Sequence, residues 1–342
     1  MGIILTLGFL LRLFTIFAFK NINNYDLQSY FLVGKLTSQG VNIYPNIAKL
    51  YHPYLPFFLY IEALAYNIGK SQETVSIIIK LINTLFDLGN IYLIFLISKN
   101  LKKTLLYAIN PVLILTFSLH GQFDAIPIFF LLLAIYYLRQ NRELLSMINY
   151  SLAILIKTWP LIFICAVFKY LKDKKKIFII IFLPIFFTIF YLIVFRSLFL
   201  YILRTILNYQ GVWGVWGLSI FFQNLRFSYQ KIITITFLLI FFLISFSLKK
   251  KNIIDKIYFL LVFFIIFSPT FSIQYFSWFM PFLILKKPKN YNVIIVLITF
   301  YLIFNYLLWA YKFELIYFNI ITLTVWFLIL KIYYAYILKK IN

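Results

Sequence analysis

Acidic side chains are scarce in this sequence, so each one can be weighed as a candidate for proton transfer. The chain has 342 residues, of which only nine are Asp or Glu. Asp26 and Asp124 stand beside apolar stretches and next to other polar residues. A carboxylate held at the boundary between an apolar layer and water suits a general base. Either residue could instead serve only as a helix cap, and both interpretations stay open.

Cationic side chains complement these carboxylates. Lys157 lies within an apolar stretch, where an isolated ammonium group is costly unless it meets an anion. A lipid phosphate would satisfy it through charge-assisted hydrogen bonds. The basic residues that flank the segment 196–231 either share this role or anchor the chain to lipid headgroups. They are Arg196, Arg204, Arg226 and Lys231.

Four more polar residues are predicted to lie on the same side of a membrane as these carboxylates and cations: His52, His120, Gln122 and Gln274. We expect His52, Gln122 and Gln274, together with Asp124, to orient hydroxyl groups of substrates. The two histidines have neither a cysteine nor paired carboxylates beside them, so the signal for a metal site is weak. No metal or other cofactor is therefore predicted.

Some polar residues are predicted to be structural. Asp87 shares a helix face with Lys80 and Asn83, which is typical of a polar stripe that joins helices. Arg12 lies in the middle of the first apolar stretch, where it either snorkels toward the interface or reaches the site. Glu62 has no polar neighbours in the sequence.

The composition excludes an ordinary soluble domain. Hydrophobic residues make up 64% of the chain and charged residues 12%, more apolar surface than a soluble interior of this size can bury. Runs such as 75–97, 177–195 and 232–248 are long enough to cross a bilayer. We predict an all-α polytopic membrane protein with about 10–13 transmembrane helices. The first 20 residues are interpreted as the first of these helices and not as a signal peptide.

The net charge of +23 does not indicate nucleic-acid binding, because the basic residues cluster between apolar runs. This distribution is typical of cytoplasmic loops. The clusters are 99–103, 139–142, 169–176, 249–256, 286–289 and 339–340.

Placing all six clusters on one side requires an even number of crossings between neighbouring clusters. Three intervals are then filled by short helical hairpins, with polar tips at 120–124, 157–160 and 268–274. The alternative is one long tilted helix through each interval. Half-length spans are tolerated where their tips line a protein-walled or wet cavity. With hairpins, these tips and the long segments 20–74 and 196–231 all face the outer side.

Several different short motifs follow one another in a recognisable order along the chain. They are Asn24-Tyr25-Asp26, then Gln39-Gly40, Tyr44-Pro45 and Tyr51-His52-Pro53-Tyr54-Leu55-Pro56, then Asn110-Pro111 with Gly121-Gln122-Phe123-Asp124, then Lys157-Thr158-Trp159-Pro160, and Gln274-Tyr275-Phe276-Ser277-Trp278 with Pro281. This order resembles the GT-C superfamily of polyprenyl-phosphate-sugar-dependent glycosyltransferases. The resemblance is greatest to the mannosyltransferases that add the first mannose of glycosylphosphatidylinositol anchors, and to their prokaryotic relatives.

The resemblance implies one integral membrane glycosyltransferase domain over residues 1–342, with a GT-C-like fold and inversion at the anomeric carbon. It implies Asp26 as the catalytic residue, a polyprenyl- or dolichyl-phosphate sugar as donor, and a lipid- or glycan-linked acceptor. Lys157, with Arg196, Arg204 or Lys231, would hold the phosphate. We expect a prokaryotic plasma membrane protein whose site faces outward. Asn24 stands where these mannosyltransferases have the first Asp of Asp-x-Asp, so neither a chelated metal nor mannose itself is implied.

A non-enzymatic flippase or transporter for lipid-linked sugars is the alternative function. Carriers commonly contain repeated halves with matching interrupted helices, and the sequence has no convincing internal repeat. Polar tips gathered on one face also favour an enzyme over a carrier.

Overall fold

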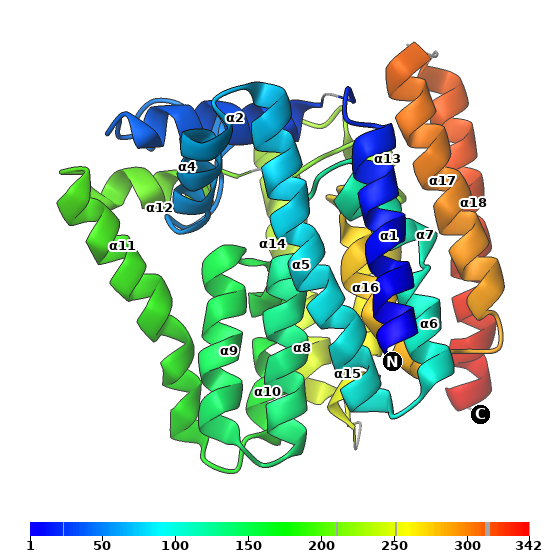
Figure 1. The fold of residues 1–342 in the computed structure, drawn as a ribbon. Coiled ribbons are helices and arrows are strands. Elements are labelled where there is room, and N and C mark those ends of the chain that lie inside the picture. Colours follow the sequence, from blue (N-terminus) through cyan, green and yellow to red (C-terminus); the bar gives the residue numbers. More distant parts are fainter. Residues whose placement is uncertain (23, 210, 250–251, 312–314, 342) are drawn as a thin grey trace. The chain divides into compact units, whose positions relative to one another are not determined.

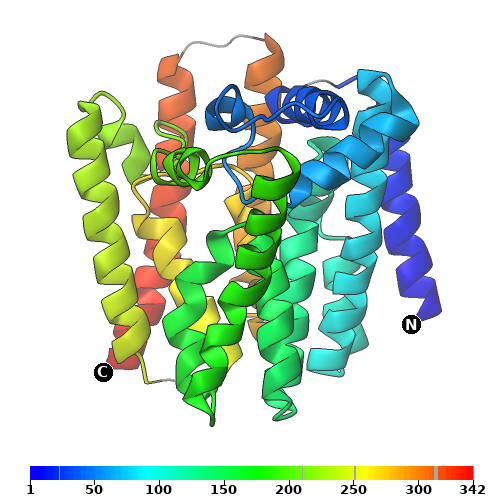
Figure 2. The ribbon, with the colours of Figure 1, turned by 90° about the vertical axis from the view of Figure 1, so that its left-hand side faces the viewer.

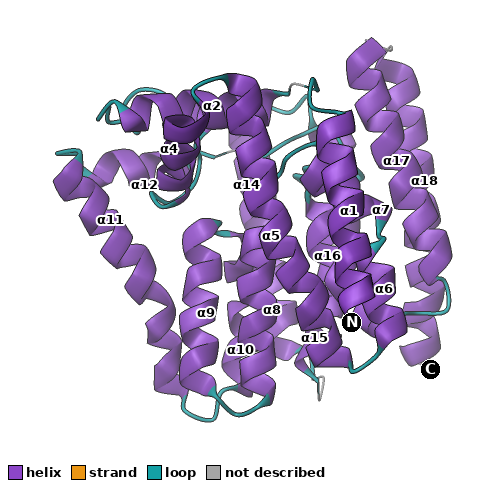
Figure 3. Cartoon of the chain, viewed as in Figure 1, coloured by secondary structure: helices purple, strands orange, loops and turns teal. Residues whose placement is uncertain are grey.

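The computed structural model describes residues 1–22, 24–209, 211–249, 252–311 and 315–341, and the side chains of all these except 307–317 and 335–341. Every regular element in the described part of the chain is a helix (Figure 3). The chain forms two compact units. Unit 1 comprises residues 1–110 and 114–209, and unit 2 comprises 111–113 and 210–342. The segment 196–231 includes the boundary between them.

The helices of unit 1 follow the apolar runs of the sequence. They are α1 (Gly2–Ala18), α2 (Tyr25–Ser38), α3 (Ala48–Tyr51), α4 (Phe58–Gly69), α5 (Gln72–Ser98), α6 (Leu101–Ala108), the π-helix η1 (Ile114–Leu119), α8 (Ala125–Arg139), α9 (Glu143–Ile156), the 3-10 helix η2 (Trp159–Phe163), α10 (Ile164–Tyr170), the 3-10 helix η3 (Lys174–Ile181), α11 (Phe182–Val194) and α12 (Phe199–Leu207). The long segment 20–74, which is predicted to face outward, thus contains α2, α3 and α4.

Helix α5 organises unit 1, since α1, α4, α6 and α8 all pack against it. The helices α2, α4 and α12 gather at one end of the unit (Figures 1 and 2). The connections α5–α6, α8–α9 and α10–η3 lie at the opposite end (Figure 1). These connections contain the basic clusters 99–103, 139–142 and 169–176, which the sequence places on one side.

Unit 2 consists mainly of long apolar helices. Its elements are α7 (Pro111–Leu113), α13 (Leu218–Phe222), α14 (Phe227–Ser247), α15 (Ile253–Phe267), α16 (Tyr275–Lys286), α17 (Tyr291–Tyr311) and α18 (Leu315–Ile341). Trp216 is fully buried, and its indole N–H donates to the carbonyl of Ile265 at 2.9 Å. This bond ties the segment before α13 to the α15–α16 hairpin.

Among the described residues, three helices are long and apolar enough to cross a membrane: Gln72–Ser98, Lys174–Val194 and Phe227–Ser247. They coincide with three of the runs that the sequence predicts as spans, 75–97, 177–195 and 232–248. Ile193 of α11 and Leu243 of α14 are 72% and 68% exposed, and each lies among other exposed apolar residues. Such faces are unfavourable in water and favourable against lipid. Several shorter apolar helices accompany them.

The three intervals are interrupted where the hairpin prediction places their tips, and none is a single continuous helix. The interruptions lie between η1 and α8, between α9 and α10, where the short helix η2 intervenes, and between α15 and α16. Helices α8, α9, α15 and α16 have 15, 14, 15 and 12 residues. At 1.5 Å per residue they are shorter than a hydrocarbon core of about 30 Å.

Candidate functional site

One end of unit 1 brings two of the predicted carboxylates together around Gln122. The Gln122 amide Nε2 donates to Oδ2 of Asp26 at 2.6 Å. Nζ of Lys157 lies 2.7 Å from Oδ2 of Asp124 and 3.5 Å from Oε1 of Gln122. The side chains Asp26, Gln122, Lys157 and Asp124 therefore form one continuous polar chain.

Helix α2 is held in place by the residue before it. The Oδ1 atom of Asn24 accepts the backbone N–H of Leu27 at 3.0 Å, and its Nδ2 donates to the carbonyl of His120 at 2.8 Å. Asn24 is thus both the N-cap of α2 and a link to the 120–124 tip. Asp26 is left free of capping and lies in the first turn, where the helix dipole favours a negative charge.

The tip itself is shaped by backbone contacts. Gly121 has φ +89°, which is costly for other residues. The Nδ2 atom of Asn83 on α5 donates to the Gln122 carbonyl, and the backbone N–H of Gln122 donates to the carbonyl of Thr116 at 3.1 Å. These bonds fix the backbone at Gln122.

An aromatic wall backs the charged pair. The ring of Phe123 stacks on Phe58 with centroids 3.6 Å apart. Nζ of Lys157 lies 4.4 Å from the centroid of Phe123 and 5.3 Å from that of Tyr54. The ammonium group is therefore held by two rings as well as by Asp124.

Substituting Gly121 with alanine should destabilise the tip by about 1–3 kcal/mol, the usual cost of a non-glycine residue in a sparsely populated conformation. A Cβ at this position would lie 2.7 Å from Cδ2 of Leu27, in addition to the unfavourable φ of +89°. The measurement is the free energy of unfolding in detergent. Gly40 offers a matched control, because it has φ +75° but no atom within 4 Å of an added Cβ. Equal losses in the two variants would contradict the crowding that we describe at Gly121.

Asp26 and Asp124 differ sharply in exposure. The Asp26 side chain is 32% exposed, whereas that of Asp124 is fully buried and that of Lys157 is 7% exposed. Asp124 is the N-cap residue of α8 by position, but its side chain makes no capping hydrogen bond and binds Lys157 instead. Asp26 is therefore the carboxylate of this cluster that a substrate can reach.

His120 borders Asp26, with Nε2 3.8 Å from Oδ2 of the carboxylate. Burial lowers the pKa of His120, and the charges of Lys80 and Lys157 lower it further, while Asp26 and Asp124 oppose the shift. The imidazole is therefore neutral at neutral pH and acts as a hydrogen-bonding group.

His52 and Glu62 form a second buried pair. Nδ1 of His52 lies 3.3 Å from Oε2 of Glu62, and both side chains are fully buried. The prediction that Glu62 has no polar neighbour is wrong, because α3 and α4 bring the two together. The ring of Tyr54 packs edge-on against His52 and also contacts Lys157, so His52 lies behind the aromatic wall instead of presenting its imidazole to a ligand.

Glu62 should make unit 1 less stable as the pH rises. Burial raises the pKa of Glu62 above 4.5, with His52 working in the other direction. A carboxyl with a higher pKa in the folded state binds more protons folded than unfolded, so stability is greatest below pH 4.5 and falls above it. We expect the Glu62→Gln variant to gain stability relative to wild type as pH is raised from 4.5 to 7, measured by thermal unfolding in detergent. A pH-independent difference would contradict the raised pKa.

The remaining predicted residues are divided between the two units. Arg196 and Arg204, in unit 1, are exposed, and no hydrogen bond or ion pair to either side chain is found within the described residues. Lys231 is exposed at the start of α14, in unit 2. Gln274, also in unit 2, accepts a hydrogen bond from Ser272 through its Oε1 atom.

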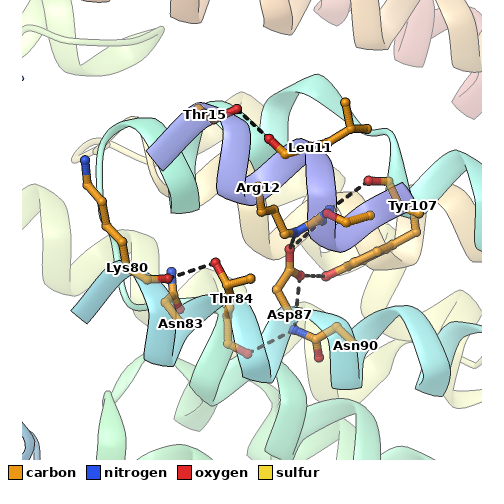
Figure 4. Close-up of polar contacts among 12 residues, drawn as sticks. Leu11, Arg12, Thr15, Lys80, Asn83, Thr84, Asp87, Asn90 and Tyr107 are labelled. Atoms are coloured by element: carbon orange, nitrogen blue, oxygen red, sulfur yellow. Dashed lines mark hydrogen bonds and ion pairs between the residues drawn. The ribbon is translucent and has the colours of Figure 1, made fainter. Parts of the chain in front are cut away.

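Arg12 neither snorkels nor reaches the cluster. Its Nε and Nη2 atoms lie 2.7 and 2.6 Å from Oδ2 of Asp87, and its Nη1 donates to the carbonyls of Gly8 and Ala108 (Figure 4). The Tyr107 hydroxyl donates to Oδ1 of Asp87 at 2.9 Å. This network is fully buried and ties α1, α5 and α6 together.

Comparisons with protein-family models, with curated proteins and with solved structures found no match for this chain.

Sequence reasoning assigned no site role to Asn24, Asn83 or Lys80, all of which contact the 120–124 tip or its neighbours. A signal existed for two of them. Lys80 and Asn83 are polar residues on one face of an otherwise apolar span. The sequence reveals the shared face but not which tip packs against it.

Proposed function

We propose that this chain is a membrane glycosyltransferase of GT-C type that acts on the extracytoplasmic face of a prokaryotic plasma membrane. It would transfer a mannose-like hexose from a polyprenyl- or dolichyl-phosphate sugar to a lipid- or glycan-linked acceptor. The observation that supports this most is a partly exposed carboxylate, Asp26, held by Gln122 beside a buried Lys157–Asp124 pair.

In this mechanism Asp26 takes the proton of an acceptor hydroxyl. The hydroxyl oxygen forms a bond to the anomeric carbon of the donor. The bond between that carbon and the phosphate oxygen breaks, and its electron pair leaves with the polyprenyl phosphate. One displacement of this kind inverts the anomeric configuration. Gln122 keeps the base oriented by donating to Oδ2 of Asp26.

The short hairpins support a site at the membrane surface. The Lys157–Asp124 bridge joins the end of α9 to the start of α8. This ion pair would be unfavourable if it faced lipid directly. Non-helical backbone at such depth is tolerated where it is enclosed by protein or lines a wet cavity. Lys157 has its anion in Asp124, so we assign it to fixing the tip.

The test is transfer of label by the purified protein in detergent, with a labelled polyprenyl-phosphate hexose and a mixture of lipid acceptors. We expect labelled product, with inverted anomeric configuration, in the absence of any sealed compartment. Movement of label across sealed vesicles without product formation would instead support the carrier.

A further inference from the structure

Lys80 is a buried lysine that has no acidic partner within the described residues. It lies on α5 and is 1% exposed. Asp87, on the same helix, is occupied by Arg12 and Tyr107. Figure 4 shows the Lys80 side chain extending away from that network, with no bond drawn to its Nζ atom. No hydrogen bond or ion pair to Nζ is found anywhere in the described part of the chain.

The end of Lys80 reaches the candidate site. A Cβ placed on Gly121 would lie 3.2 Å from Cε of Lys80, so the lysine passes directly against the tip. The neighbouring residue His120 responds to the charge of Lys80 and contacts Asp26 at 3.8 Å. Lys80 and Asp26 thus both lie near His120.

The two lysines of the site differ in whether an acidic side chain pairs with them. Lys157 has Asp124 at 2.7 Å, whereas Lys80 has no acidic partner among the described residues. A buried ammonium group without an anion is strongly unfavourable, and such groups in membrane proteins commonly mark a ligand or ion path. An anion supplied by a ligand would remove this cost.

We propose that Lys80, and not Lys157, is the cation that binds the phosphate group of the lipid-linked sugar. This inference rests on the proposed function, because it identifies the phosphate subsite of that reaction. When the bond between the sugar and the phosphate breaks, the departing phosphate oxygen gains negative charge. Hydrogen bonds from Nζ of Lys80 to this group stabilise that charge.

The experiment measures binding of sugar-free polyprenyl phosphate to the purified protein in detergent, with polyprenol and inorganic phosphate as separate probes. We expect Lys80→Met to weaken binding of polyprenyl phosphate at least tenfold and to leave binding of polyprenol unchanged. Lys80→Arg should retain most of the affinity. Lys49→Met, which changes an exposed lysine on α3, is the matched control and should bind as wild type does.

Thermal unfolding separates a lost ligand contact from a lost fold. Lys80→Met removes an unpaired charge and should melt at or above the wild-type temperature, whereas Lys157→Met leaves Asp124 buried without its cation and should melt lower. Wild-type affinity in Lys80→Met would overturn the inference, as would a larger affinity loss in a folded Lys157→Met protein. Equal Lys80-dependent binding of inorganic phosphate would overturn the lipid assignment. Failure of the label-transfer test alongside Lys80-dependent binding would reject only the proposed function.

Discussion

Replacing Asp26 with asparagine should lower the rate of sugar transfer by about 10²–10⁴-fold, the usual contribution of a general base. An asparagine oxygen can still accept the hydrogen bond that Gln122 donates at 2.6 Å, but it cannot take a proton from the acceptor. The side chain is also 32% exposed, so the substitution leaves no buried group unpaired. The loss should therefore fall on kcat, with donor binding retained.

The measurement is kcat at saturating donor, together with the melting temperature of the same preparation. Asp173→Asn is the matched control, since Asp173 is 50% exposed and caps η3 through a bond that asparagine also makes. It should transfer sugar at the wild-type rate. A folded Asp26→Asn protein with wild-type kcat would remove this residue from the mechanism.

Breaking the buried Arg12–Asp87 pair should cost about 3–5 kcal/mol of unfolding free energy, as is typical when one partner of a buried ion pair is removed. In Arg12→Met the Asp87 carboxylate keeps the Tyr107 hydroxyl but loses its cation, and the carbonyls of Gly8 and Ala108 lose their donor. We would follow unfolding of the variant in mixed detergent–SDS micelles.

A surface pair provides the comparison. Lys20 and Glu73 lie 3.1 Å apart with both side chains about half exposed, so Lys20→Met should cost no more than about 1 kcal/mol. In the combined variant Arg12→Met/Asp87→Leu, the loss should be smaller than the sum of the single losses, because neither charge remains buried alone. A cost below about 1 kcal/mol for Arg12→Met would show that the network does not hold α1 to α5 and α6.

Local patterns in the sequence were sufficient to predict most of the helical framework. The runs 75–97, 177–195 and 232–248 became long helices because an unbroken apolar stretch can satisfy its backbone hydrogen bonds only internally in a membrane. The hairpin tip 120–124 followed from the polar residues and glycine that interrupt the apolar run there. The same local logic identified Asp26 as a carboxylate just beyond the first span.

The partners of the buried charges depended on the tertiary structure. The sequence shows that Arg12, Asp87, Lys157 and Asp124 all need partners, because an isolated charge is unfavourable in an apolar interior. Arg12 pairs with a residue 75 positions away, and Lys157 with one 33 positions away.

Helix packing chose among these partners. It gave Asp124 to Lys157 and Asp87 to Arg12, and it left Lys80 without an acidic partner within the described residues. Composition and periodicity alone established that charges had to meet within the apolar layer. Only the packing of α5 against α1 and α6, and of α8 against α9, decided which charges met, because the attraction between charges depends on their distance and not on their order in the chain.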